Sequence, residues 1–69
     1  MRLVYRNLDG NIRIVADDVK DENEALEFLL KDQRQRFIYQ TGKIKIKKMP
    51  KYFSFENAAG EDSGYRLEI

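Results

Sequence analysis

The chain has 69 residues, of which 42% are hydrophobic and 36% charged, and its 13 Lys and Arg against 12 Asp and Glu leave a net charge of +1. This length fits one small domain spanning residues 1–69, and the composition is that of a globular chain, not a disordered one. Because Cys and His are both absent, a disulfide framework, the usual zinc and copper sites and a Ser–His–Asp arrangement are excluded.

No apolar run is long enough for a membrane helix, and no export signal stands at the start of the chain. We therefore expect a cytoplasmic domain that needs no metal, cofactor or membrane. A chain of this size buries only about 60% of its unfolded surface. We expect a homodimer or a bound partner to supply part of its stability.

The first predicted elements are two strands at residues 2–7 and 12–16, which are rich in β-branched and aromatic side chains. Asp9-Gly10 lies between them and is a strong hairpin signal, because Gly adopts positive φ without steric cost. A two-residue loop at this point predicts a core face with the pairs Tyr5–Ile14 and Leu3–Ala16. The outer face then carries the pairs Val4–Val15 and Arg6–Arg13.

A helix is predicted from Asp21, a good N-cap followed three residues later by Glu24 in capping-box spacing. An apolar stripe follows at helical spacing, with Phe28 at its edge, and consists of Ala25, Leu26, Leu29 and Leu30. Residues 31–36 are all polar, so the helix is expected to end near Gln33.

A second hairpin is predicted around Thr41-Gly42, with arms at residues 37–40 and 43–48. Its second arm alternates, with Ile44 and Ile46 inward and lysines outward. The alternative is a longer helix that reaches Tyr39 and ends before Gly42. Pro50 breaks the chain, and further strands are expected at residues 52–56 and 65–69 around a loop at 57–64. The predicted fold is α+β, a single helix packed on an antiparallel sheet in the order ββαββ(ββ).

Positive charge is concentrated between residues 31 and 51. Alternate lysines on a strand repeat every 6–7 Å or so, a spacing that can follow phosphates. The alternative is structural, because lysine on an exposed strand also blocks aggregation. The first candidate site for nucleic acid, another anion or a partner consists of Lys43, Lys45, Lys47, Lys48, Lys51, Arg34 and Arg36.

A second candidate interface combines arginine with valine on one sheet face, as protein interfaces often do. Its predicted members are Arg2, Val4, Arg6, Arg13 and Val15. Arg6 directly opposite Arg13 would cost stability unless an acid lies nearby, and Glu56 or Glu68 is the expected partner.

The leading hypothesis is a small non-catalytic binding or regulatory module that contacts a protein partner or a second copy of itself. Nucleic-acid binding through the basic hairpin of residues 34–51 is the first alternative. The second is a small metal-independent ribonuclease that uses Tyr39, Tyr52, Arg34 and Arg36. The acidic run at residues 17–27 lacks the spacing of a calcium loop and is attributed to helix capping. In composition the chain resembles the small accessory proteins of phages and other mobile elements.

Overall fold

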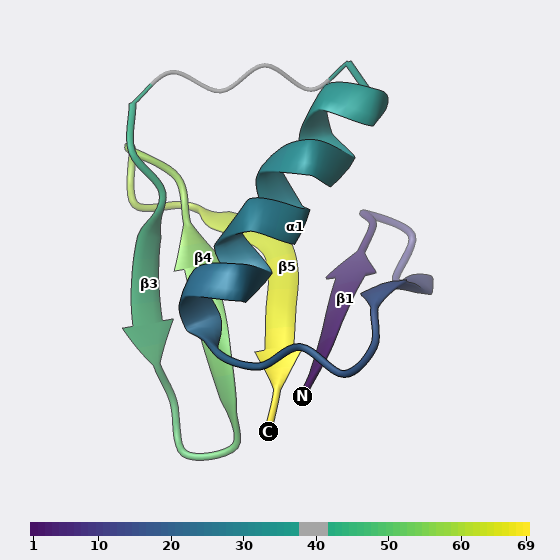
Figure 1. Ribbon diagram of the computed structural model, residues 1–69. Coiled ribbons are helices and arrows are strands. Elements are labelled where there is room, and N and C mark those ends of the chain that lie inside the picture. Colours follow the sequence, from purple (N-terminus) through teal and green to yellow (C-terminus); the bar gives the residue numbers. More distant parts are fainter. Residues whose placement is uncertain (38–41) are drawn as a thin grey trace.

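A computed structural model describes residues 1–37 and 42–69. One helix packs on one face of a five-stranded antiparallel sheet whose strand order is β2-β1-β5-β4-β3 (Figure 1). This arrangement confirms the predicted α+β class. The elements are β1 (Arg2–Arg6), β2 (Ile12–Ala16), α1 (Glu22–Gln35), β3 (Lys45–Lys48), β4 (Tyr52–Glu56) and β5 (Asp62–Glu68).

The core lies between α1 and the sheet. Its fully or almost fully buried side chains come from the sheet, from the helix and from the segment before the helix. They are Leu3, Val19, Ala25, Leu29, Phe55, Tyr65 and Leu67. Ile44 and Ile46 pack against this cluster, which confirms the inward positions predicted for them. The opposite face of the sheet carries no helix in the described part of the chain.

The start of α1 confirms the capping prediction. The Asp21 carboxylate accepts a hydrogen bond from the Glu24 backbone N–H at 2.9 Å. The Glu24 carboxylate accepts in turn from the Lys20 backbone N–H at 3.2 Å, one residue before the usual position. Glu22 and Glu24 also place negative charge at the positive end of the helix dipole.

The end of α1 lies two residues beyond the predicted position, at Gln35. The polar residues Asp32 and Gln33 are only 7% and 5% exposed, so they continue the buried face that Ala25 and Leu29 begin. Leu30, predicted within the apolar stripe, is instead 41% exposed. The helix is longer than predicted because its buried face continues with polar side chains. A search for apolar residues at helical spacing does not detect such a continuation.

The β1–β2 loop differs from the predicted two-residue turn. The Asn7 backbone N–H donates to the Asn11 carbonyl at 3.0 Å, and Gly10 has φ +85°. The Asn7 side-chain oxygen accepts from the backbone N–H groups of Asp9 and Asn11, each at 3.0 Å. The loop therefore contains three residues and ends on a left-handed Gly, a common hairpin type.

This longer loop moves the pairing by one residue. Val4 pairs with Ile14 and Tyr5 with Arg13, so the predicted Tyr5–Ile14 and Val4–Val15 pairs are wrong. Because side chains alternate between faces, the shift turns Arg13 toward the helix and Ile14 toward the open face.

The predicted Arg6–Arg13 pair is also wrong, because Arg6 lies opposite Ile12. An irregularity between Leu3 and Val4 absorbs the shift, so the predicted Leu3–Ala16 pair is present.

The first arm of the predicted second hairpin, residues 37–40, is wrong at Phe37, the one residue of that arm that the structure describes. Phe37 follows the helix with φ +57°, is 78% exposed and belongs to no strand. The rest of that arm, residues 38–40, lies outside the described residues, as does Thr41. β3 pairs with β4, and Lys45 lies opposite Glu56. The alternative helix to Tyr39 is also wrong, since α1 ends at Gln35.

The β4–β5 loop repeats the chemistry of the first loop. The Asn57 side-chain oxygen accepts from the backbone N–H groups of Ala59 and Glu61, each at 3.0 Å. β5 consequently begins at Asp62, earlier than the predicted start at residue 65. Tyr65 and Leu67 are buried as predicted, whereas Ile69 lies beyond the strand and is exposed.

Candidate functional site

In the described part of the chain, a cluster of ionisable groups lies on the covered face of the sheet, centred on the buried Asp32 of α1. Arg13 of β2 donates two hydrogen bonds to its carboxylate, from Nη1 to Oδ1 at 3.0 Å and from Nη2 to Oδ2 at 2.8 Å. The Tyr65 hydroxyl of β5 donates to Oδ2 at 2.6 Å. Arg36 Nε lies 3.8 Å from the same oxygen. Asp32 therefore joins the helix to two strands.

These contacts determine how the cluster titrates. Burial alone would raise the pKa of Asp32, but the hydrogen bonds from Arg13 and Tyr65 and the positive charges of Arg13 and Arg36 together outweigh it, so the pKa lies below its ordinary value. Burial, followed by the hydrogen bond to Asp32, raises the pKa of the Tyr65 hydroxyl. The hydrogen bonds to Asp32 raise the pKa of Arg13. At neutral pH the cluster thus holds a carboxylate, a neutral phenol and charged guanidinium groups.

Aromatic contacts enclose this cluster. The rings of Tyr5 and Tyr65 have centroids 4.8 Å apart, and the Arg13 guanidinium carbon lies 5.5 Å from the Tyr5 centroid. Both Asp32 oxygens are engaged by donors, so neither serves as a free base. The geometry is that of a structural link between helix and sheet.

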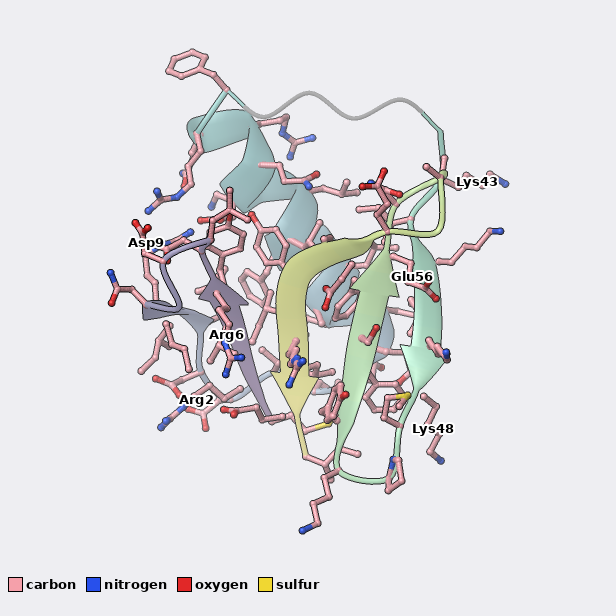
Figure 2. The ribbon with its side chains drawn as sticks, turned by 180° about the vertical axis from the view of Figure 1, so that it is seen from behind. Arg2, Arg6, Asp9, Lys43, Lys48 and Glu56 are labelled. Carbon is pink, nitrogen blue, oxygen red and sulfur yellow. The ribbon has the colours of Figure 1, made fainter. Side chains whose placement is uncertain are left out.

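The open face of the sheet offers a different arrangement, visible from behind in Figure 2 with Arg2 and Arg6 on β1. One row of side chains crosses all five strands. The paired residues Val4–Ile14, Val4–Arg66, Ser54–Arg66 and Lys47–Ser54 define it. The row is apolar on β2 and β1, and it continues with Arg66 on β5, Ser54 on β4 and Lys47 on β3.

The flanking rows contain charges of both signs. Lys45 lies directly opposite Glu56. Arg2 lies opposite Glu68 and also donates from Nε to Asp17 at 2.8 Å. The Asp17 hydrogen bond raises the pKa of Arg2. Arg2 therefore forms an ion pair with Asp17, whereas Lys45 has an acid opposite it on β4 but forms no ion pair within the described residues.

Besides Lys45, which has Glu56 opposite it, three cations of the open face form no ion pair within residues 1–37 and 42–69, namely Arg6, Arg66 and Lys47. Arg66 instead lies over the ring of Tyr52, with its guanidinium carbon 4.5 Å from the centroid. Arg6 neighbours Ile12, which is 58% exposed, and Ile14 beside Val4 is 51% exposed. We refer to Arg6, Arg66, Lys47, Ile12 and Ile14, together with Val4, which lies on this face but is only 6% exposed, as the open-face patch.

The fold brings together only part of the first predicted site, the basic residues between Arg34 and Lys51. Lys45 and Lys47 share the open face, but Lys48 lies opposite Phe53 and belongs to the other face. Lys43 precedes β3 in the sequence and Lys51 follows it, so neither belongs to the strand. Arg34 and Arg36 lie at the end of α1, across the sheet from the open face. The candidate residues therefore do not form one continuous surface.

The second predicted interface needs a correction. Arg2, Val4 and Arg6 lie on the open face as expected. Arg13 faces the helix and binds Asp32, and Val15 packs against the core, so neither belongs to this surface. The three-residue loop after Asn7 is the cause, since it shifts the register of β2.

Ile12 and Ile14 occupy the open-face places that the prediction gave to Arg13 and Val15. Sequence reasoning also missed Arg66, because its neighbours on the sheet become known only with the strand order. The spacing of Asn and Gly at 7 and 10, repeated at 57 and 60, was an available signal for the loop type.

The ribonuclease candidates do not converge among the described residues. Tyr52 lies under Arg66 on the open face, whereas Arg36 lies near Asp32 at the end of α1. Tyr39 is outside the described residues. In residues 1–37 and 42–69, no group of three or more acidic side chains is arranged to hold a metal ion.

No family model, no curated protein and no solved structure matches this chain. Within the described part of the chain, α1 is neither long nor apolar enough to cross a membrane. The function is therefore inferred from the residues themselves.

Proposed function

We propose that this protein is a non-catalytic binding module that docks its open-face patch on an acidic protein surface with an apolar centre. The observation that carries the proposal is the juxtaposition of three cations without acidic partners and two half-exposed isoleucines on one uncovered sheet face. Protein interfaces typically combine an apolar centre with arginine-rich surroundings.

The chemistry of the patch suits carboxylates. Arginine donates two parallel hydrogen bonds to a carboxylate, which gives both orientation and strength. Arg66 is held by its contact with Tyr52, so less side-chain freedom is lost when it binds. Ile12 and Ile14 supply the area that excludes water next to these charges.

Nucleic-acid binding is less well supported by the same face. Phosphate tracking requires a row of free cations, whereas Lys45 faces Glu56 and Arg2 faces Glu68. Base stacking requires a free aromatic ring, and the ring of Tyr52 is contacted by Arg66. The apolar half of the patch has no role in holding phosphates.

The test is an NMR titration of the isotope-labelled protein with two kinds of probe. One is a short peptide in which Asp and Glu alternate with Leu and Ile, and the other is single-stranded DNA or RNA. At physiological ionic strength we expect the peptide to shift the amide signals of Val4, Ile14 and Arg66. Shifts caused by the oligonucleotides should disappear as salt is raised, because phosphate binding is strongly salt-dependent.

Two charge reversals sharpen this test. Arg66→Glu changes the patch, and Arg34→Glu makes the same change of charge at the end of α1. We expect Arg66→Glu to weaken peptide binding about tenfold, equivalent to about 1.4 kcal/mol, and Arg34→Glu to change it less than about twofold.

Several outcomes would contradict the proposal. Equal losses in the two variants would indicate a long-range effect of net charge without a defined patch. Oligonucleotide binding that persists at physiological salt and is lost in Lys47→Glu would assign nucleic acid as the ligand. A lack of shifts with every probe would contradict docking on acidic surfaces.

A further inference from the structure

The two edge strands of the sheet differ in chemistry. β3 carries Lys45, Lys47 and Lys48 and is followed by Pro50, features that discourage pairing with another strand. β2 reads Ile-Arg-Ile-Val-Ala and has neither lysine nor proline. Its isoleucines are half exposed on the open face. An edge strand of this kind is a template for pairing with another chain.

The backbone of β2 is oriented for such pairing. Asn7 and Asn11 are hydrogen-bonded at the loop, so the alternation of an antiparallel ladder makes Tyr5–Arg13 the next hydrogen-bonded pair. The backbone N–H and C=O groups of Ile12 and Ile14 then point away from β1, toward the free edge. In the described part of the chain no strand pairs there.

We propose that two copies of this chain associate by antiparallel pairing of β2 with β2, around a two-fold axis that passes between the two Ile14 residues. This register places Ile14 opposite its own copy, Arg13 opposite Val15 and Ile12 opposite Ala16. A register centred on Arg13 would place two like charges opposite one another, which is destabilising. Charge thus excludes the register centred on Arg13, and centring on Ile14, the middle residue of β2, pairs all five residues of the strand.

The pairing joins two five-stranded sheets into one continuous sheet with both helices on the same side. The isoleucine side chains stay on the open face, where Ile12 and Ile14 of the two copies form an apolar strip. The dimer adds backbone hydrogen bonds and contact area to a domain whose own core is small. The dimer and the proposed function share Ile12 and Ile14, whereas the cations Arg6, Arg66 and Lys47 of the open-face patch lie outside the paired strands and are accessible in either state.

Disulfide trapping tests the register, since the chain contains no cysteine of its own. In a hydrogen-bonded antiparallel pair the Cα atoms are about 5.5 Å apart, within the range that a disulfide spans. Ile14→Cys should therefore form a covalent dimer rapidly under mild oxidation. Ile12→Cys is the matched control on the same strand and face, because its two copies are about 13 Å apart along the strands.

Lys47→Cys on β3 is a second control for random collision. We expect Ile14→Cys to cross-link at least tenfold faster than both controls on a non-reducing gel. Equal rates in all three variants would contradict specific pairing, and faster cross-linking of Ile12→Cys would contradict this register.

Sedimentation of the cysteine-free protein provides an independent readout. We expect the unmodified chain and Ile69→Lys to dimerise with rising concentration and Ile14→Lys to remain monomeric. Ile69 is a suitable comparison because it is exposed and apolar but lies beyond β5, away from β2. A monomer at every concentration would overturn dimerisation while leaving the test of peptide binding unaffected.

Discussion

The two faces of the sheet use charge in opposite ways. On the covered face, the Asp32 carboxylate receives hydrogen bonds from Arg13 and Tyr65 and is nearly inaccessible to water. On the open face, Arg6 and Arg66 have no acidic partner in the described part of the chain. Charge on the first face stabilises the fold, and charge on the second is available to a partner. Substitutions on the two faces should therefore have different consequences.

The largest expected effect on the covered face is that of Asp32→Ala. It leaves the Arg13 guanidinium and the Tyr65 hydroxyl without their acceptor, and we expect the free energy of unfolding to fall by about 3 kcal/mol. Urea denaturation followed by circular dichroism measures this change. Asp17→Ala is the control, because Asp17 also pairs with an arginine but is exposed, and it should have little effect. Equal losses would contradict a special role for Asp32.

A smaller effect is expected for Tyr65→Phe, which keeps the buried ring and removes only the hydroxyl. The lost hydrogen bond to a charged acceptor should lower the free energy of unfolding by about 1.5 kcal/mol. Tyr52→Phe makes the same chemical change on the open face and should be close to neutral. A neutral Tyr65→Phe would show that the hydroxyl does not stabilise the fold.

The depressed pKa of Asp32 predicts a graded loss of stability in acid. The folded-state pKa lies below the unfolded value of about 3.9, so the contribution is fully present above that pH. It should disappear progressively as the pH falls through the lower, folded-state pKa. Measured by urea denaturation between neutral and strongly acidic pH, Asp32→Asn should lose this part of the pH dependence. An unchanged acid slope in that variant would contradict the prediction.

Much of the fold is predictable because local signals and tertiary packing agree. The N-cap at Asp21, the inward Ile44 and Ile46 and the buried Tyr65 and Leu67 follow from capping chemistry and alternation. The end of α1 is not predictable in this way, because Asp32 is buried through polar contacts with Arg13 and Tyr65, and the polar Gln33 is buried beside it.

The candidate site is less predictable because it depends on register and strand order. One additional residue in the β1–β2 loop exchanges the positions of Arg13 and Ile14 between the two faces. Arg66 joins the open-face patch only because β5 lies between β1 and β4. Strand order does not follow from the composition of single segments, and the only local signal for the loop length is the spacing of Asn7 and Gly10.

The placement of Ile14 on the open face underlies both the binding patch and the proposed dimer, and one measurement tests it most directly. We would determine the free energy of unfolding of Ile14→Lys by urea denaturation in dilute solution, where the monomer dominates. Because Ile14 is about half exposed, we predict a loss of less than about 1 kcal/mol. A loss of about 3 kcal/mol or more would mean that Ile14 lies in the core, and would contradict the register from which both proposals are drawn.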